Sequence, residues 1–177
     1  MELSDLFLQH GTVVEKSAKE FVFRQGESDS FIYFVKTGLL KATYLSSDGK
    51  EYVKSFLAEG DNISSLVSSH AKQPCPFNLV CIEPCTLIKL PFDSVFTMSL
   101  NDQTLSEIAI SYLLQLVIKK EQREYEFLCL SAQDRLEQLE ERLPNIIRRV
   151  TQADIARYLG ITPVALSRMR KQSRQNA

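Results

Sequence analysis

The sequence predicts an α+β chain in which an all-β unit comes first and helices follow. Short runs rich in Val, Ile, Phe and Tyr alternate with turn-forming residues over roughly the first ninety positions. Residues 101–129 then contain neither Gly nor Pro, and two short helical patterns flank Gly160 near the end. The chain has 177 residues, 44% of them hydrophobic, so it can bury a core, and wholesale disorder is excluded.

The all-β unit is expected to consist of short strands joined by tight turns. The strands are expected at Glu20–Phe23, Phe31–Lys36, Leu39–Leu45, Glu51–Leu57 and Leu79–Leu90. The sequence Ser-Ser-Asp-Gly at 46–49 predicts a hairpin, because Asp48 and Gly49 tolerate positive φ. Short strands at a spacing of roughly 8–12 residues are typical of a small barrel or sandwich.

A single long helix is predicted from Asn101, a residue type that caps helices, to about Cys129. Its first half is apolar on nearly every side, and one small barrel covers only one face of a helix. A second copy of the same helix is the simplest cover for the rest, which predicts a homodimer. The alternative is a helix buried wholly within a monomer. The expected dimer interface consists of Leu105, Ile108, Tyr112 and Leu116.

Three further helices are expected after Cys129. Ser131–Asp134 and Thr151–Asp154 each have the Ser/Thr-x-x-acid form of a capping box, which predicts a helix start at both places. The first of these helices ends at Pro144 and the second at Gly160. A third helix then follows the pair Thr162-Pro163, since Pro suits the first helical position after a hydroxyl cap.

Residues 152–171, QADIARYLGITPVALSRMRK, have the spacing of a helix-turn-helix. Ala156 is small where the two helices cross, and Gly160 supplies the positive φ of the turn. The buried side is expected to hold Ile155, Leu159, Ile161, Leu166 and Met169. The residues expected at DNA are Thr151, Thr162, Pro163, Val164, Ser167, Arg168, Lys171 and Arg174. The alternative is an ordinary helical hairpin with an incidental basic face.

The charge is distributed unevenly along the chain. Residues 1–100 carry nine Lys and Arg against twelve Asp and Glu, whereas residues 145–177 carry seven basic residues and one acid. A basic end on an acidic body fits a polyanionic partner, and it equally fits a solvated tail. The residues expected at phosphates are Arg148, Arg149, Arg157 and Arg174.

The order of these units resembles the Crp/Fnr family of bacterial transcription factors. The segment FRQGESDSFIYFVKTGLLKATYLSSDGKEYVKSFLAEGD (23–61) resembles that family's β-roll, and LGITPVALSRMRK is similar to the ending of a shorter branch. The resemblance implies a double-stranded β-helix or jelly-roll-like sensor over 1–98, a dimerisation helix over 99–130 and a helix-turn-helix over 131–177. The wing hairpin of longer members is missing.

The function implied is that of a dimeric, sequence-specific DNA-binding regulator. Its partners would be a double-stranded DNA operator, a second copy of the chain and RNA polymerase. The alternative is a ligand-sensing or protein-docking β-roll module that does not bind DNA. Retention on random duplex with a steep salt dependence would discriminate between the two.

The sequence departs from the family where cyclic-nucleotide-binding members hold their ligand. Those members have a Glu for the ribose and an Arg for the phosphate, and here the matching positions fall at Ser65 and near Cys75. A charged phosphate without a partner is costly to bury, so we expect cyclic AMP to bind poorly and no cofactor to be needed. The candidate pocket residues are Ser64, Ser65, Leu66, Lys72, Cys75, Ile118 and Lys119.

Other chemistry is expected to be absent. Cys75, Cys81 and Cys85 are expected to act as small hydrophobic residues, with a thiol switch or an iron–sulfur cluster as alternatives. No metal site and no grouping of a nucleophile with a base is expected, which argues against an enzyme. No apolar run reaches the roughly 18–20 residues of a membrane span, and unpaired cysteines fit a reducing cytoplasm.

Overall fold

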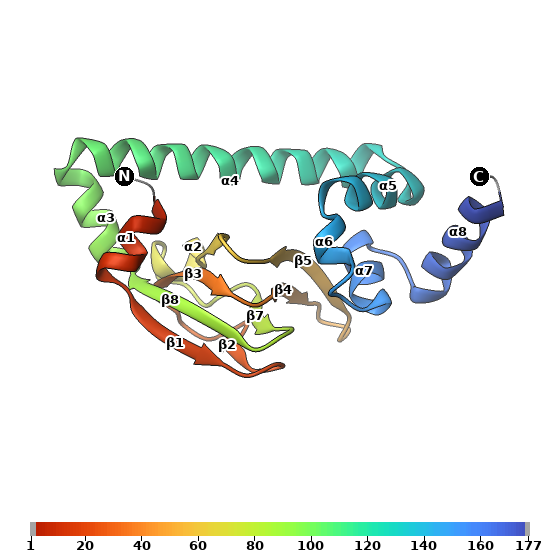
Figure 1. Ribbon diagram of the computed structural model, residues 1–177, viewed down its shortest axis with the longest axis horizontal. Helices are drawn as coiled ribbons and strands as arrows, with labels where there is room; N and C mark the ends of the chain where they lie inside the picture. The colour runs from red at the N-terminus through yellow and green to blue at the C-terminus, as the bar shows by residue number, and fades with distance from the viewer. Residues whose placement is uncertain (1–2, 176–177) are drawn as a thin grey trace.

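The computed structural model describes residues 3–175, with side chains described up to Gln172, and it confirms the α+β class (Figure 1). The β unit consists of two four-stranded antiparallel sheets. In spatial order the first sheet holds β1 (Thr12–Lys16), β8 (Cys85–Pro91), β3 (Phe31–Thr37) and β6 (Asn62–Ile63). The second holds β2 (Phe21–Phe23), β7 (Asn78–Cys81), β4 (Leu40–Leu45) and β5 (Glu51–Leu57).

The space between the two sheets is filled by side chains. Val35, Leu40, Leu79 and Leu87 are completely buried there. Aromatic rings fill much of the same core, where the Phe23 ring lies between those of Tyr33 and Phe77 and packs against both. The buried residues come from strands of both sheets, as in a sandwich whose two inner faces interdigitate.

The apolar run Leu79–Leu90 was expected to be one strand and is two. β7 ends at Cys81 and β8 begins at Cys85, and the two strands lie in different sheets. The intervening turn packs against Leu39, whose carbonyl accepts hydrogen bonds from the Ile82 and Glu83 backbone N–H groups. The sequence does not show this corner, because the strands on both sides of it are buried and together read as one continuous apolar run.

Four short helices were not expected from the sequence. They are α1 (Leu3–His10), α2 (Leu66–Ser69), α3 (Phe92–Asn101) and α6 (Pro144–Ile147). α3 continues through Asn101, so the long helix α4 (Gln103–Cys129) is capped by Asp102 instead of Asn101. The Asp102 carboxylate accepts a hydrogen bond from the Leu105 N–H at 2.9 Å. α4 then runs past the whole β-roll (Figure 1).

The C-terminal helices turn back from the end of α4 onto the β-roll (Figure 1). They are α5 (Ala132–Arg142), α6 (Pro144–Ile147), α7 (Gln152–Leu159) and α8 (Pro163–Gln175). Their buried leucines and isoleucines form one hydrophobic cluster with Leu39, Val53 and Phe56 of the β-roll. The Phe56 and Tyr158 rings stack with centroids 5.4 Å apart across this boundary. The helical end and the β-roll therefore share a core.

Two glycines at positive φ provide a matched test of the corner between β3 and β4. Gly38 has φ +100° and a Cβ added there would lie 2.5 Å from the Pro84 carbonyl oxygen, whereas Gly49 has φ +81° and open space. Both Gly→Ala changes incur the left-handed strain of roughly 1–2 kcal/mol. Gly38→Ala adds an overpacking cost of about 1–3 kcal/mol. Urea unfolding should therefore show Gly38→Ala as the more destabilised variant, and equal losses would contradict this packing.

Candidate nucleic-acid interface

α7 and α8 form the predicted helix-turn-helix. Thr151 caps α7, and its Oγ1 accepts a hydrogen bond from the Asp154 N–H at 3.1 Å. Gly160 ends α7 in the left-handed region at φ 71°, as the turn requires. The Thr162 hydroxyl then accepts from the Ala165 N–H, and Pro163 is the first residue of α8.

The predicted buried side of this motif is confirmed. Ile155, Leu159 and Leu166 are completely buried, and Ile161 and Met169 pack partly buried against the same cluster. The Phe127 ring of α4 lies under the turn, where a Cβ on Gly160 would approach it to 3.0 Å. The turn is thus held between its own helices and the long helix.

The opposite side of α8 is exposed. Val164 is 60% exposed, and α8 projects away from the β-roll (Figure 1). Of the residues expected at DNA, those with exposed side chains are Thr151, Thr162, Pro163, Val164, Ser167, Arg168 and Lys171. Arg174 lies outside the described side chains. Among the described residues neither Arg168 nor Lys171 has an ion-pair partner.

Two of the arginines expected at phosphates are instead occupied by the chain's own carboxylates. Arg149 donates to Glu59 at 2.9 and 3.0 Å and to Glu83 at 2.6 and 3.1 Å. Arg157 lies 3.5 Å from Glu51 and 3.4 Å from Asp154. Charge counted along the sequence cannot show this pairing, because the three glutamates come from the distant β-roll. Arg148 remains exposed and unpaired within the described part of the chain.

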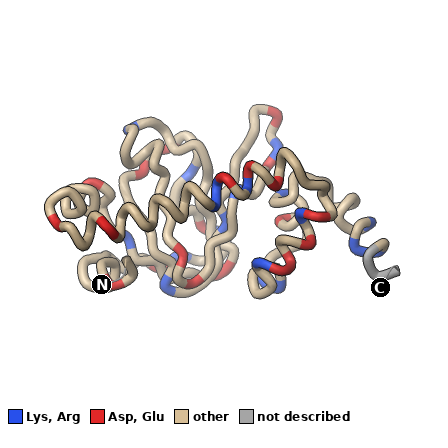
Figure 2. The backbone as a smooth tube through the Cα atoms, turned by 90° about the horizontal axis from the view of Figure 1, so that it is seen from above, with Lys and Arg blue, Asp and Glu red and all other residues tan. Residues whose placement is uncertain are grey.

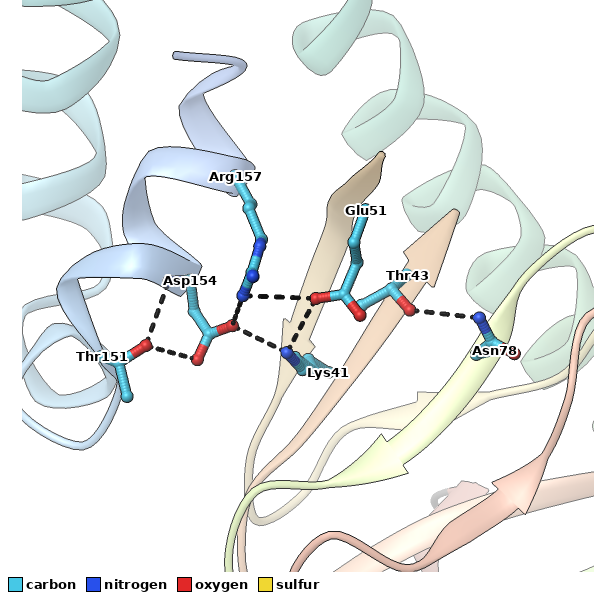
Figure 3. A network of polar contacts seen from close by, with 7 residues as sticks. All are labelled: Lys41, Thr43, Glu51, Asn78, Thr151, Asp154 and Arg157. Atoms are coloured by element: carbon cyan, nitrogen blue, oxygen red, sulfur yellow. Dashed lines mark hydrogen bonds and ion pairs between the residues drawn. The ribbon is translucent and has the colours of Figure 1, made fainter. Parts of the chain in front are cut away.

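Asp154 joins α7 to the β-roll through a ring of four charges (Figure 3). Its Oδ1 accepts from Lys41 Nζ of β4 at 2.7 Å, and Lys41 also donates to Glu51 of β5 at 3.0 Å. Arg157 completes the ring between Glu51 and Asp154. Burial alone would raise the pKa of Asp154, but hydrogen bonds from Lys41 and Thr151 outweigh it and lower that pKa.

This ring also corrects the expectation of two equivalent capping boxes. At α5 the box closes, because Asp134 accepts from the Ser131 backbone N–H at 3.1 Å. At α7 the Thr151 half forms, but the Asp154 carboxylate accepts from Thr151 Oγ1, Lys41 and Arg157. The same local sequence thus serves a contact between distant parts of the chain.

A second buried carboxylate joins the motif to α4. Glu126 is 5% exposed and accepts from Arg142 at 2.7 Å and from Arg123 at 3.5 Å. The Arg123 guanidinium lies over the Tyr158 ring at 3.6 Å and donates to the Tyr158 carbonyl. The helix-turn-helix is therefore tied both to the β-roll and to the long helix.

Comparison with known proteins agrees with this architecture. The cyclic nucleotide-binding domain family matches residues 13–102, half of the chain. The anaerobic regulatory protein of Haemophilus influenzae is 25% identical over 93% of this chain and 67% of its own length. The structure of FixK2 from Bradyrhizobium japonicum superposes with a TM-score of 0.79 at 18% identity, covering 94% of this chain and 85% of that one.

The chain belongs to the cyclic nucleotide-binding domain family, among the Crp/Fnr regulators. The predicted resemblance is thereby confirmed, and transcription regulation is the function of these relatives. Part of the chain also resembles a protein of another kind. Patatin-like phospholipase domain-containing protein 6 of Mus musculus is 33% identical over 44% of this chain, and the match spans 6% of that relative's length. The match to the anaerobic regulatory protein, in contrast, extends over nearly the whole chain.

The candidate ligand residues of this Crp/Fnr chain do not form a charged pocket. Ser65 is 1% exposed and caps α2, accepting from the Ser68 N–H, and Ser64 pairs with Ser69 at 3.0 Å. Lys72 donates to both carboxylate oxygens of Asp93 at 3.0 Å. Cys75 is 1% exposed within the β-roll core.

The remaining candidates lie at the surface. Leu66 is 37% exposed on α2, and Ile118 is 52% exposed on α4. Lys119 lies 4.0 Å from Asp61. The structure therefore brings Ser64 and Ser65 together with α2, while the two candidate lysines, Lys72 and Lys119, each lie beside a carboxylate.

The dimer residues expected in α4 lie on its inner face. Leu105 packs against the β-roll cluster, and the Tyr112 hydroxyl donates to the Asn62 carbonyl at 3.3 Å. Ile108 and Leu116 share that face by helical spacing and are half-buried. Leu105 and Tyr112, two of the four expected residues, thus contact the chain's own β-roll. The exposed apolar face lies opposite and consists of Ile110, Leu113, Leu114, Val117, Ile118, Tyr125 and Leu128.

Two further findings concern the described residues only. None of their helices is both long enough and apolar enough for a membrane span. They contain no group of three or more His, Cys, Asp or Glu side chains placed to hold a metal ion.

The Arg149 contacts predict a specific acid dependence. Hydrogen bonds from Arg149 lower the pKa of Glu59 from 4.5 to about 2 and also lower that of Glu83. A carboxyl group whose pKa is lower in the folded state than in the unfolded state stabilises the fold at pH values above the unfolded pKa. That stabilisation is lost as the pH falls through the folded-state pKa. The stability difference between wild type and Arg149→Met should therefore be constant above about pH 5 and shrink steadily toward pH 2.

Urea unfolding between pH 3 and pH 8 measures this difference. Arg148→Met is the matched control, because Arg148 is the unpaired neighbour, and it should give no such trend. A pH-independent difference for Arg149→Met would show that the two glutamates do not hold Arg149 in solution.

Proposed function

We propose that the chain is a dimeric, sequence-specific DNA-binding regulator whose α8 reads the major groove. The observation that carries this proposal is the division of the basic residues. Arg149 and Arg157 are neutralised by the β-roll, whereas Arg168 and Lys171 stand exposed beside Val164 and Ser167, with no ion-pair partner among the described residues. Such a mixed polar and apolar face can bond base edges and touch thymine methyl groups. Exposed cations such as Arg148 are proposed to add contacts to phosphates.

Arg168 is the residue proposed to contact guanine. It lies one turn beyond Val164 on the exposed face of α8. Arg168→Ala should lose roughly 1–3 kcal/mol on the operator and little on random duplex, because a bidentate base contact discriminates sequence. Arg148→Ala should weaken both about equally and lower the salt slope. Fluorescence anisotropy measures the affinity of each variant for both duplexes. A preference for the operator that Arg168→Ala leaves unchanged would exclude the guanine contact.

The second copy is proposed to cover the outer face of α4. Ile110, Leu114, Val117 and Leu128 follow a spacing of threes and fours, interrupted by Glu121, and Figure 2 shows the first half of α4 nearly free of charge. An apolar stripe of this period is the seam of a paired helix. Two-fold symmetry would then require a pseudo-palindromic operator with half-sites about 34 Å apart.

Leu114→Glu should dissociate this dimer, because a carboxylate buried at the seam would lack a partner. Gln122→Glu adds the same charge at an exposed position beside the stripe and should leave the dimer intact. Sedimentation velocity at micromolar concentration measures both variants. A monomeric wild type, or a dimeric Leu114→Glu variant, would rule out this seam.

The β-roll is proposed not to take cyclic AMP in the manner of its nucleotide-binding relatives. Ser65 caps a helix, Cys75 lies in the core and Lys72 is paired with Asp93. Without charged contacts to ribose and phosphate, affinity should be on the order of a hundredfold weaker or worse. Calorimetric titration of cyclic AMP and cyclic GMP measures this. Low-micromolar binding would contradict the proposal, and its loss in Lys72→Ala would identify the replacement cation.

The experiment that tests the function as a whole is selection of bound fragments from random duplexes. Enrichment of a two-fold symmetric sequence, lost on Arg168→Ala, is the expected result. No enrichment, together with no salt-sensitive retention on duplex DNA, would favour the ligand-sensing or protein-docking module instead. RNA polymerase is proposed as a further partner from the family alone.

A further inference from the structure

In the described part of the chain, the buried charged side chains lie where the C-terminal helices meet the β-roll and the long helix. They are Asp154, 6% exposed, and Glu126, 5% exposed. Asp154 lies at the start of α7 against the β-roll, and Glu126 lies in α4 against Tyr158 and α5. A buried charge adds little to stability compared with an apolar replacement, but it tolerates only an arrangement that keeps its partners. Both therefore restrict how the helix-turn-helix sits.

We infer that Lys41, a β-roll residue distant from any DNA contact, is a positioning residue for DNA reading. It acts through Asp154 by fixing the orientation of α7, and hence of α8, relative to the long helix. This inference rests on the proposed function. The inference goes beyond the proposed function, because it makes a contact between the β-roll and the helix-turn-helix determine which half-site spacing the protein prefers.

The geometry of the ring supports an orienting role. Lys41 is held from two sides, by Asp154 at 2.7 Å and Glu51 at 3.0 Å, and its side chain is only 16% exposed. Arg157 links the same two carboxylates, so the four charges alternate in sign around a closed ring (Figure 3). A rotation of α7 on the sheet would break the Lys41–Asp154 and Arg157–Glu51 contacts and leave Asp154 short of a partner.

The docked arrangement leaves the reading face open. The ring and the Arg149 contacts use basic residues on the side of the motif toward the β-roll. Val164, Ser167, Arg168 and Lys171 remain exposed on α8, which points away from both sheets (Figure 1). The contact thus orients α8 without covering it, which is the requirement for a positioning role as opposed to a blocking one.

The test is the dependence of operator affinity on half-site spacing. Lys41→Met keeps the length of the side chain and removes its charge, and Lys41→Arg restores a donor. Glu51→Gln weakens the same ring from its more exposed side and serves if Lys41→Met folds poorly. Lys36→Met, at an exposed lysine of neighbouring β3, is the matched control. Binding is measured on operators whose half-sites are moved apart or together by one and two base pairs.

The expected result is a broader spacing profile. In wild type, Lys41→Arg and Lys36→Met, a wrong spacing should cost affinity, and in Lys41→Met and Glu51→Gln that cost should fall by about tenfold. The salt slope should not change, since no phosphate contact is removed. An unchanged profile would overturn the inference, and tighter binding at every spacing would show that the ring holds α8 away from DNA.

A second readout needs no DNA and separates failure of this inference from failure of the proposed function. Hydrogen exchange of the α7 amides should be about tenfold faster in Lys41→Met than in wild type, because local opening no longer breaks the ring. Unchanged exchange in α7 would overturn the inference whether or not the wild type binds DNA. Faster exchange in Lys41→Met, together with a wild type that binds no duplex, would instead support the positioning of α7 by the ring and remove the proposed function.

Discussion

A carboxylate removed from water must keep its cationic partners, and this constraint governs how the two halves of the chain fit together. Asp154 keeps Lys41 and Arg157, and Glu126 keeps Arg142 and Arg123. Around these fixed points Leu39, Val53 and Phe56 of the β-roll complete the hydrophobic core of the helices. The apolar contact supplies most of the attraction, while the charges restrict its geometry. The helix-turn-helix is consequently part of one body with the β-roll.

This arrangement divides the basic residues of the C-terminal segment into two groups. Those facing the β-roll are paired with glutamates that come from its turns and strands. Those on α8 that face outward are unpaired within the described residues. The positive charge available to a polyanion is therefore smaller than the sequence count, and it is concentrated on the face that could enter a groove. Under the proposed function, DNA specificity would depend more on where α8 points than on total charge.

Local patterns predicted the helices and the motif well, because capping and helical periodicity depend on neighbouring residues. Thr151, Gly160 and the buried side of α7 and α8 all follow from such patterns. The corner between Cys81 and Cys85 did not, since buried strands on both sides give a continuous apolar run.

The sequence alone does not divide the apolar residues of α4 between its two faces. Leu105 and Leu114 are the same residue type, and only tertiary contacts show that Leu105 faces the β-roll while Leu114 is exposed. The ion pairs of Lys41 with Asp154 and of Arg149 with its two glutamates could not be predicted for a related reason, because each joins residues more than sixty positions apart. One signal for the Asp154 contacts was present in the sequence. This carboxylate is the acid of a capping-box pattern and lies in a basic segment, so cationic partners were available to it.

The central claim is that the β-roll, the long helix and the reading helix form one oriented body in a two-fold dimer. The most direct test is double electron–electron resonance between spin labels attached at Gln172→Cys in the two α8 helices of the dimer. Exposed Cys129 is replaced by Ser so that it takes no label. The account predicts one narrow distance distribution in the free protein, unchanged on adding operator and broadened by Lys41→Met. A broad distribution in the free wild type, or a new distance on adding DNA, would contradict it.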